Sequence, residues 1–73
     1  MQPKKVLFII APKDFRDEEL FVPKQYLEEK GVFVQVASTE HGVAKGKLGG
    51  EIKIDLSLEQ VNTKDFDAII FVG

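Results

Sequence analysis

Cysteine and tryptophan are absent from the 73 residues, and histidine and methionine each occur once. Without cysteine the chain can form no disulfide, and it can supply neither a thiolate nucleophile nor a sulfur ligand for zinc. A single histidine offers no set of metal ligands, so we expect no metal site. Small domains often depend on disulfides or metals for stability, and this chain has neither means of support.

Long apolar runs and an excess of one charge are also missing. The apolar run near the N-terminus, Val6–Ala11, is too short for the core of a signal peptide or for a membrane span. Ten Lys and Arg residues stand against twelve Asp and Glu residues, and no basic patch alternates with aromatic residues. We therefore expect a cytoplasmic protein that binds neither membranes nor nucleic acid.

The composition that remains is globular, because 44% of the residues are hydrophobic and 30% are charged. The stretch Lys5–Ala11, KVLFIIA, is apolar almost throughout and predicts a strand buried on both faces that ends at Pro12. Residues 12–17, PKDFRD, predict a loop. Asp14 or Asp17 is the candidate N-cap of the helix that follows.

An apolar stripe at helical spacing, formed by Leu20, Pro23 and Leu27, predicts this helix, and Gly31 provides its stop signal. Pro23 either kinks the helix or marks a late start near Phe21.

A second strand is predicted at Val32–Ser38. Strand, helix and strand within this length predict a βαβ unit with parallel strands and a right-handed crossover.

The second half of the chain predicts shorter elements. A short strand near Val43–Lys47 lies in a glycine-rich turn region, and the alternation in EIKIDLSL predicts one half-exposed hairpin strand over 51–58. Ser57 and Gln60 form a capping-box pattern for a single helical turn. Residues 62–67 predict a loop, and Ala68–Val72 predicts a closing strand.

The first and last strands are apolar at nearly every position, so a parallel sheet built from them needs helices on both faces. Only one convincing helix is predicted, and a bare apolar face would be unusual for a soluble monomer. We therefore expect these residues to be the N-terminal part of a larger α/β domain, whose missing layer comes from more chain or from a partner. A small independent α/β protein is the lesser alternative.

The acids Asp14, Asp17, Glu18 and Glu19 are the main candidates for chemistry. They suit the positive end of a helix dipole, which requires no function. One of them could instead lie at the carboxyl edge of the sheet and hydrogen-bond a nucleophile supplied from elsewhere in the fold.

Two other features carry weaker signals. His41 is read as a solvated loop residue, and the glycine-rich GKLGG lacks the spacing of a phosphate-binding loop. The turn after the first strand, APKDF, lacks the dinucleotide fingerprint, so we expect no cofactor.

Several segments taken together resemble the opening of the ThiJ/PfpI superfamily, the intracellular protease I-like proteins related to the Parkinson-associated deglycase and to class I glutamine amidotransferases. They are FRDEEL, VPKQYLEEKG, GKLGG followed by IDLSL, and FDAIIFVG, and the similarity covers essentially the whole chain. The resemblance implies the N-terminal part of a flavodoxin-like α/β sandwich with a mostly parallel sheet, including a βαβ unit, a hairpin and a central strand. The remainder of that domain is then the partner of this chain, and a homo-oligomer is expected.

The resemblance also implies a site. In the superfamily, a cysteine on a strained strand-to-helix turn is hydrogen-bonded by a glutamate of the first helix, which matches Glu19, with Glu18 as the alternative. Gly73 matches the first of two glycines at the oxyanion turn, although Val72 replaces the usual proline. The implied function is a cysteine-dependent hydrolase, either a peptidase or a glyoxalase or deglycase, to which this chain contributes Glu19 but no nucleophile. The alternative is a non-catalytic redox sensor, chaperone or assembly module of the same fold.

Overall fold

A computed structural model describes residues 4–72 and shows a mixed α/β fold with a mostly parallel sheet. The expected βαβ unit is present, because β1 precedes α1 and β3 follows it in the sequence, and the two strands pair in parallel. Gly73, assigned above to the oxyanion turn, lies outside the described residues. No helix in the described part of the chain has the length and apolar character needed to cross a membrane.

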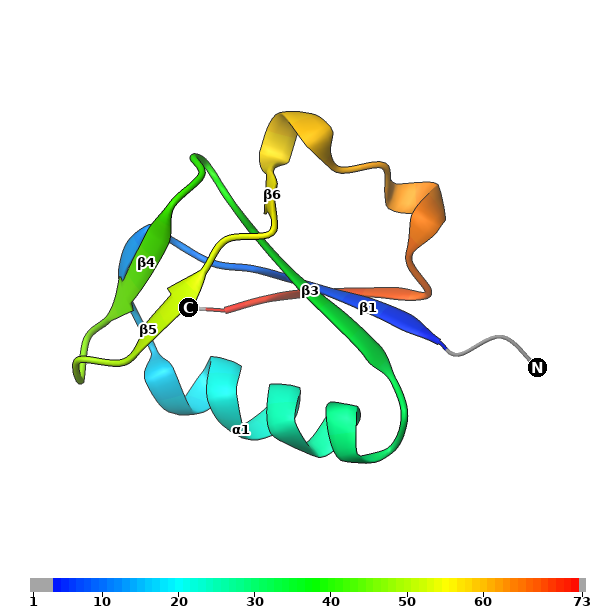
Figure 1. The fold of residues 1–73 in the computed structure, drawn as a ribbon, viewed down its shortest axis with the longest axis horizontal. Helices are drawn as coiled ribbons and strands as arrows, with labels where there is room; N and C mark the ends of the chain where they lie inside the picture. The colour runs from blue at the N-terminus through cyan, green and yellow to red at the C-terminus, as the bar shows by residue number, and fades with distance from the viewer. Residues whose placement is uncertain (1–3, 73) are drawn as a thin grey trace.

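The main sheet has four parallel strands in the order β6-β3-β1-β7 (Figure 1). Its strands are β1 (Lys5–Ile9), β3 (Phe33–Ser38), β6 (Leu56–Ser57) and β7 (Ala68–Phe71). The predictions for the first, second and last of the long strands are confirmed in place, with β1 two residues shorter and β3 and β7 each one residue shorter than expected.

A small second sheet lies beside the main one, in the order β2-β4-β5. Its strands are β2 (Lys13–Phe15), β4 (Val43–Gly46) and β5 (Glu51–Lys53). The antiparallel β4–β5 hairpin is confirmed. The prediction of a loop over 12–17 is wrong, because Lys13–Phe15 pairs in parallel with β4 and Phe15 is fully buried.

The prediction of one strand over 51–58 is also wrong. The chain crosses from the small sheet to the main one between β5 and β6, so the two halves pair with different strands. Ile54 is buried at this crossing, and its amide donates to the Gly42 carbonyl at 2.8 Å.

Helix α1 (Asp17–Glu29) begins after Arg16, which is its N-cap and makes no side-chain capping bond. The expectation that Asp14 or Asp17 caps the helix is therefore wrong. Pro23 lies inside the helix, so the late start near Phe21 is also wrong. The stop at Gly31 is confirmed: its φ is 82°, a left-handed conformation that glycine adopts without strain.

Two single-turn helices precede β7. The first, η1 (Leu58–Gln60), confirms the expected turn, since the Ser57 amide donates to the Gln60 side-chain oxygen at 3.0 Å. The second, η2 (Thr63–Asp65), forms where only a loop was expected, and the Asn62 side chain accepts from the Lys64 amide.

The core lies between α1 and the main sheet. Val6, Phe8 and Val36 point toward α1 and are buried together with Leu20. Because side chains alternate along a strand, Leu7 faces away from α1.

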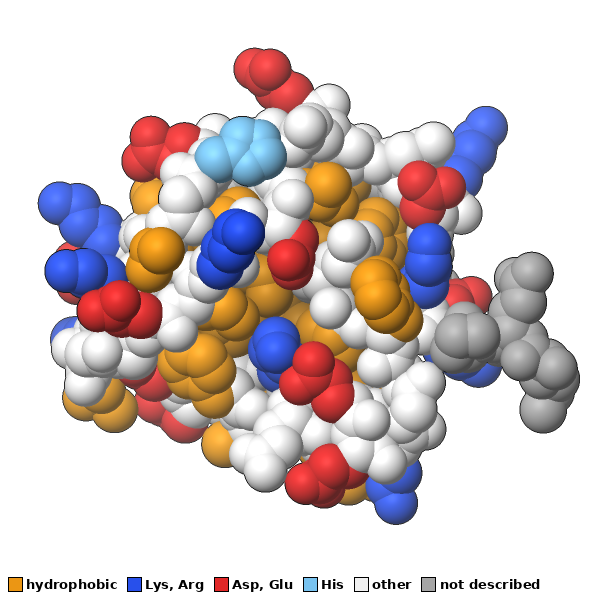
Figure 2. Space-filling model, viewed as in Figure 1, with side chains coloured by type: hydrophobic (Ala, Val, Ile, Leu, Met, Phe, Trp, Pro, Cys, Tyr) orange, Lys and Arg blue, Asp and Glu red, His pale blue; other side chains and the backbone are white. Residues whose placement is uncertain are grey.

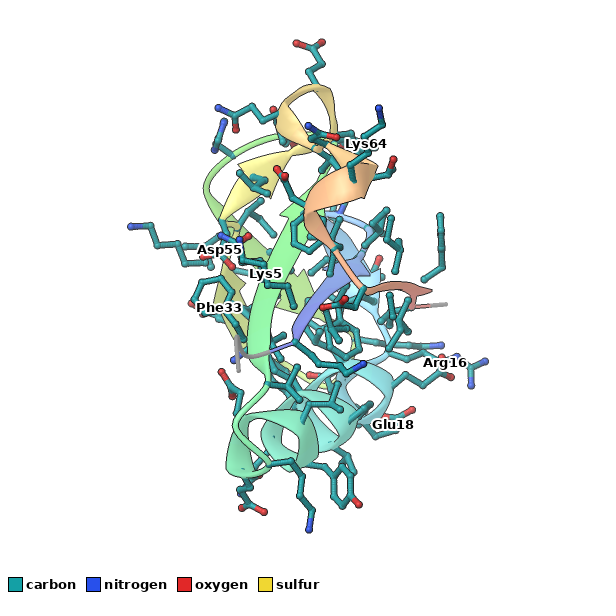
Figure 3. The ribbon with its side chains drawn as sticks, turned by 90° about the vertical axis from the view of Figure 1, so that its right-hand side faces the viewer. Lys5, Arg16, Glu18, Phe33, Asp55 and Lys64 are labelled. Atoms are coloured by element: carbon teal, nitrogen blue, oxygen red, sulfur yellow. The ribbon has the colours of Figure 1, made fainter. Side chains whose placement is uncertain are left out.

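On that far side lie η1 and η2, opposite α1 (Figure 3). We expected this second face of the sheet to be bare, but Leu7 and Ala37 are fully buried there, so part of the face is covered. Cover is still incomplete, because Phe71 at the end of β7 is 72% exposed. Figure 2 shows hydrophobic side chains gathered in the middle of one side of the molecule, with charged side chains around them.

Two aspartates each bind one strand residue twice, through the backbone amide and the side-chain carboxylate of the aspartate. The amide of Asp67 donates to the Lys5 carbonyl at 2.7 Å, and its carboxylate accepts from the Lys5 amide at 2.8 Å. Asp55 makes the same pair of bonds to Val36, each at 2.9 Å. Each aspartate thus satisfies the backbone of one residue where a neighbouring strand would otherwise do so.

Candidate functional site

The expected site region is the first turn of α1. Strand β1 leads through β2 into this turn, and the β4–β5 hairpin and the end of β7 lie on the same side of the molecule (Figure 1). This is the carboxyl edge of the parallel strands, where ligands of open α/β sheets bind. Within this turn, the acids Asp17, Glu18 and Glu19 have different surroundings.

Asp17 is turned inward and is only 9% exposed. One carboxylate oxygen accepts from the Leu48 amide at 2.8 Å, and the other accepts from the Gly50 amide, also at 2.8 Å. These two bonds fasten the tip of the β4–β5 hairpin to the start of the helix.

The hairpin glycines make room for this contact. A Cβ added at Gly46 or Gly50 would overlap the Asp17 carboxylate, and at Gly50 it would also meet the Phe21 ring. The turn between these glycines is closed by a bond from the Gly46 amide to the Gly50 carbonyl at 2.6 Å. The glycine-rich segment therefore surrounds a carboxylate of the protein itself.

The pKa of Asp17 is lowered from its ordinary value of 3.8, chiefly because the Leu48 amide donates to the ionised carboxylate. Burial acts in the opposite direction, and the Gly50 amide adds to the lowering. Asp17 is therefore ionised at neutral pH and fully used in holding the hairpin.

Glu19 differs from Asp17 because its side chain is 46% exposed at the surface. Its carboxylate lies 3.8 Å from Arg16 Nε, an exposed ion pair that contributes little to stability. Figure 3 shows Arg16 and Glu18 pointing outward from the start of α1, on the side of the sheet where β7 lies. Both glutamates are thus accessible to a group arriving from outside the chain.

A pocket of about 230 Å³ lies where this turn meets the hairpin tip. It is lined by Arg16, Asp17, Glu18, Lys47 and Leu48. Acids and cations line it together, but the described residues hold no cysteine. This part of the chain can therefore position and polarise a reacting group but supplies no thiol of its own.

A second pocket, of about 150 Å³, lies beside the exposed His41 and is also lined by Pro12, Lys13 and Glu40 among others. No group of three or more metal-ligating side chains occurs within residues 4–72.

The sequence reasoning missed the contact between Asp17 and the hairpin. From the sequence alone, nothing distinguishes Asp17 from the neighbouring acids, and the glycine-rich turn shows no phosphate-binding spacing. The available signal was an acid at the helix start together with two glycines four residues apart, Gly46 and Gly50, which permit a close approach.

Comparison with known proteins places this geometry in context. Residues 4–73 match the DJ-1/PfpI family. An uncharacterized protein of Methanocaldococcus jannaschii is 48% identical over 73 residues, which are 100% of this chain and 36% of that protein. The deglycase PfpI of Pyrococcus furiosus is 44% identical over 69 residues, covering 94% of this chain and 41% of that protein.

Among solved structures, a ThiJ/PfpI domain protein from Brachyspira murdochii superposes with a TM-score of 0.94 at 40% identity. The match covers 100% of this chain and 42% of that one. The chain thus spans about two fifths of the length of the relatives that it matches.

Proposed function

The chain belongs to the DJ-1/PfpI family, and from this premise we propose that it is the N-terminal portion of a cytoplasmic, cysteine-dependent hydrolase. The whole protein would be an intracellular peptidase or an enzyme of glyoxalase or deglycase type. A relative 44% identical to this chain bears the name deglycase. Because the chain covers 41% of that relative, the nucleophile would come from the remainder of the domain.

The observation that carries the proposal is the placement of Glu19. It is the third residue of α1, its side chain is exposed, and it lies at the carboxyl edge of the main sheet. We propose that Glu19 hydrogen-bonds the sulfur of a cysteine from the remainder of the domain, and that Glu18 remains the alternative. A thiolate is the reactive form of cysteine, and groups within hydrogen-bonding reach determine how much of it forms.

The second element of the proposed site is the end of β7. The strand ends at Phe71 and is followed by Val72 and Gly73. Backbone amides just beyond Gly73 would donate to the developing oxyanion.

Assembly is part of the same proposal. Val22 and Tyr26 are 65% and 58% exposed, and they lie one turn apart on α1. Exposed apolar side chains at this spacing suit a contact with another copy, so we propose a homo-oligomer.

Replacing Glu19 with Gln in the intact protein tests the catalytic role. We expect turnover to fall by about 10²- to 10⁴-fold, the usual contribution of a positioned acid or base, and the pKa of the nucleophilic thiol to change. The measurements are steady-state turnover of a small aldehyde or peptide substrate and the pH dependence of thiol alkylation.

Glu29→Gln is the matched control, because Glu29 is exposed at the opposite end of the same helix. If Glu19→Gln leaves both turnover and the thiol pKa unchanged, the role assigned to Glu19 is wrong. If the intact protein has no cysteine on a strand-to-helix turn further along the chain than β7, the chain belongs to a non-catalytic member of the fold, such as a redox sensor, chaperone or assembly module.

A further inference from the structure

The contact between Asp17 and the hairpin bears on how Glu19 is held. We propose that Asp17 is a positioning residue, which fastens the first turn of α1 to the hairpin tip and thereby holds Glu19 where it meets the nucleophile. The inference rests on the function proposed above, and it assigns a role to a residue that does not itself touch the reacting atoms.

The first turn of α1 has weak support of its own. Arg16, the N-cap residue, makes no side-chain capping bond, so one of the usual contributions to the stability of a helix start is missing. Pro23 inside the helix has no amide hydrogen, so the second turn is joined to the first by one hydrogen bond fewer. A helix start of this kind frays unless tertiary contacts hold it.

Two buried residues provide those contacts, and Glu19 lies between them. Leu20 is fully buried against the sheet, and Asp17 is fastened to the hairpin by bonds of 2.8 Å to Leu48 and Gly50. They are the two buried residues of α1. Leu20 fixes the depth of the turn, and Asp17 fixes its lateral position relative to the hairpin.

The hairpin is shaped to receive this carboxylate. Gly46 and Gly50 leave space that any side chain would fill, and the Leu48 and Gly50 amides converge on the two carboxylate oxygens. Leu48 itself is 78% exposed, so burial of its side chain does not fix the tip. The tip is held by the hydrogen bonds to Asp17, together with the bond from the Lys47 amide to the Phe15 carbonyl at 2.9 Å.

Accurate placement matters at such a site because a displacement of about 1 Å far from the chemistry can cost about 10²-fold in rate. A loosened first turn would let the Glu19 carboxyl move relative to a sulfur fixed on another element. The result would be a lower kcat with little change in KM, since Asp17 contacts no substrate in this proposal.

The test is a double-mutant cycle in the intact protein with Asp17→Asn, Glu19→Gln and the pair. The Asn amide keeps the size of the side chain but turns an NH₂ group toward one of the hairpin amides. We expect Asp17→Asn alone to lower kcat by about tenfold to 10²-fold and to shift the thiol pKa in the same direction as Glu19→Gln. In the Glu19→Gln background, Asp17→Asn should have no further effect on either quantity.

Asp14→Asn is the matched control, because Asp14 is exposed and Asn suits its positive φ of 63°. If Asp17→Asn fails to fold, Gly50→Ala disturbs the same contact from the hairpin without changing any charge. We expect Gly50→Ala to give the same shift of the thiol pKa.

The outcomes separate the two proposals. If Glu19→Gln has no effect, the proposed function fails. If Glu19→Gln acts but Asp17→Asn and Gly50→Ala leave the thiol pKa unchanged, or if Asp17→Asn lowers turnover equally in both backgrounds, Asp17 is only structural and the present inference is overturned.

Discussion

Asp17 and Glu19 are two residues apart in the sequence, yet the fold uses them in opposite ways. Asp17 is 9% exposed and gives both oxygens to backbone amides, whereas the Glu19 side chain is 46% exposed beside Arg16. A carboxylate that is already satisfied cannot easily serve a reaction. Burial and the two hairpin hydrogen bonds therefore identify Asp17 as a structural acid, whereas the exposed Glu19 side chain is accessible from outside the chain.

The lowered pKa of Asp17 predicts a dependence of stability on pH. A group whose pKa is depressed in the folded state stabilises that state above its unfolded pKa, which is 3.8 here, and loses this contribution as the pH falls through the folded value. We expect the free energies of unfolding of the intact protein and of Asp17→Asn to differ by a constant amount near neutral pH. That difference should shrink once the pH falls below 3.8.

Urea unfolding of both proteins across an acid series measures this difference. Asp14→Asn, at an exposed carboxylate nearby, serves as the control that should show no comparable trend. An undiminished difference at the lowest pH would contradict the assignment of the stabilisation to the ionised Asp17.

Helix α1 is attached to the rest of the fold through few residues. The sequence predicted an apolar stripe at Leu20, Pro23 and Leu27, and of these only Leu20 is fully buried while the other two are partly exposed. The helix therefore depends on a small number of contacts for its place on the sheet.

Leu20→Ala should accordingly destabilise the intact protein by about 2–5 kcal/mol, the cost of removing a fully buried leucine side chain and leaving a cavity. Gln25→Ala, at an exposed position on the same helix, should change stability by less than about 0.5 kcal/mol. Chemical denaturation of both variants checks the pair. Equal losses would show that α1 is not held chiefly through Leu20.

At the scale of the whole molecule, the predictions of strands and of the helix end succeeded where local pattern decides, and those that depend on distant pairing failed; the N-cap of α1 and the turn η2 are local exceptions. Apolar runs identified β1, β3 and β7, and Gly31 identified the end of α1. Strand β2 was missed because its pairing with β4 joins residues about thirty positions apart, such as Phe15 and Gly46.

The same limit applied to the site. The resemblance to a known family drew attention to Glu19, but only the three-dimensional structure brought Asp17 to the glycines of the hairpin. The division of EIKIDLSL between two sheets was equally hidden, because the alternation of side chains continues across the crossing.

The isolated 73-residue chain should aggregate or unfold without a cooperative transition. Phe71 is 72% exposed, and within residues 4–72 no strand pairs with the outer edge of β7. An open, apolar edge of this kind promotes association between chains. Thermal unfolding followed by circular dichroism, with the intact protein as the reference, would decide, and a sharp reversible transition of a monomer would refute the expectation.

The paired bonds of Asp67 to Lys5 and of Asp55 to Val36 have a consequence for how the strands find their alignment. A slip of β7 along β1 by one residue would turn Ile70 from the side of α1 to the opposite side, and it would also part Asp67 from Lys5. Hydrophobic burial and a hydrogen-bonded carboxylate thus reject the same error independently. Each of the two aspartates therefore adds a hydrogen-bonding penalty to any shift of its strand away from the native register.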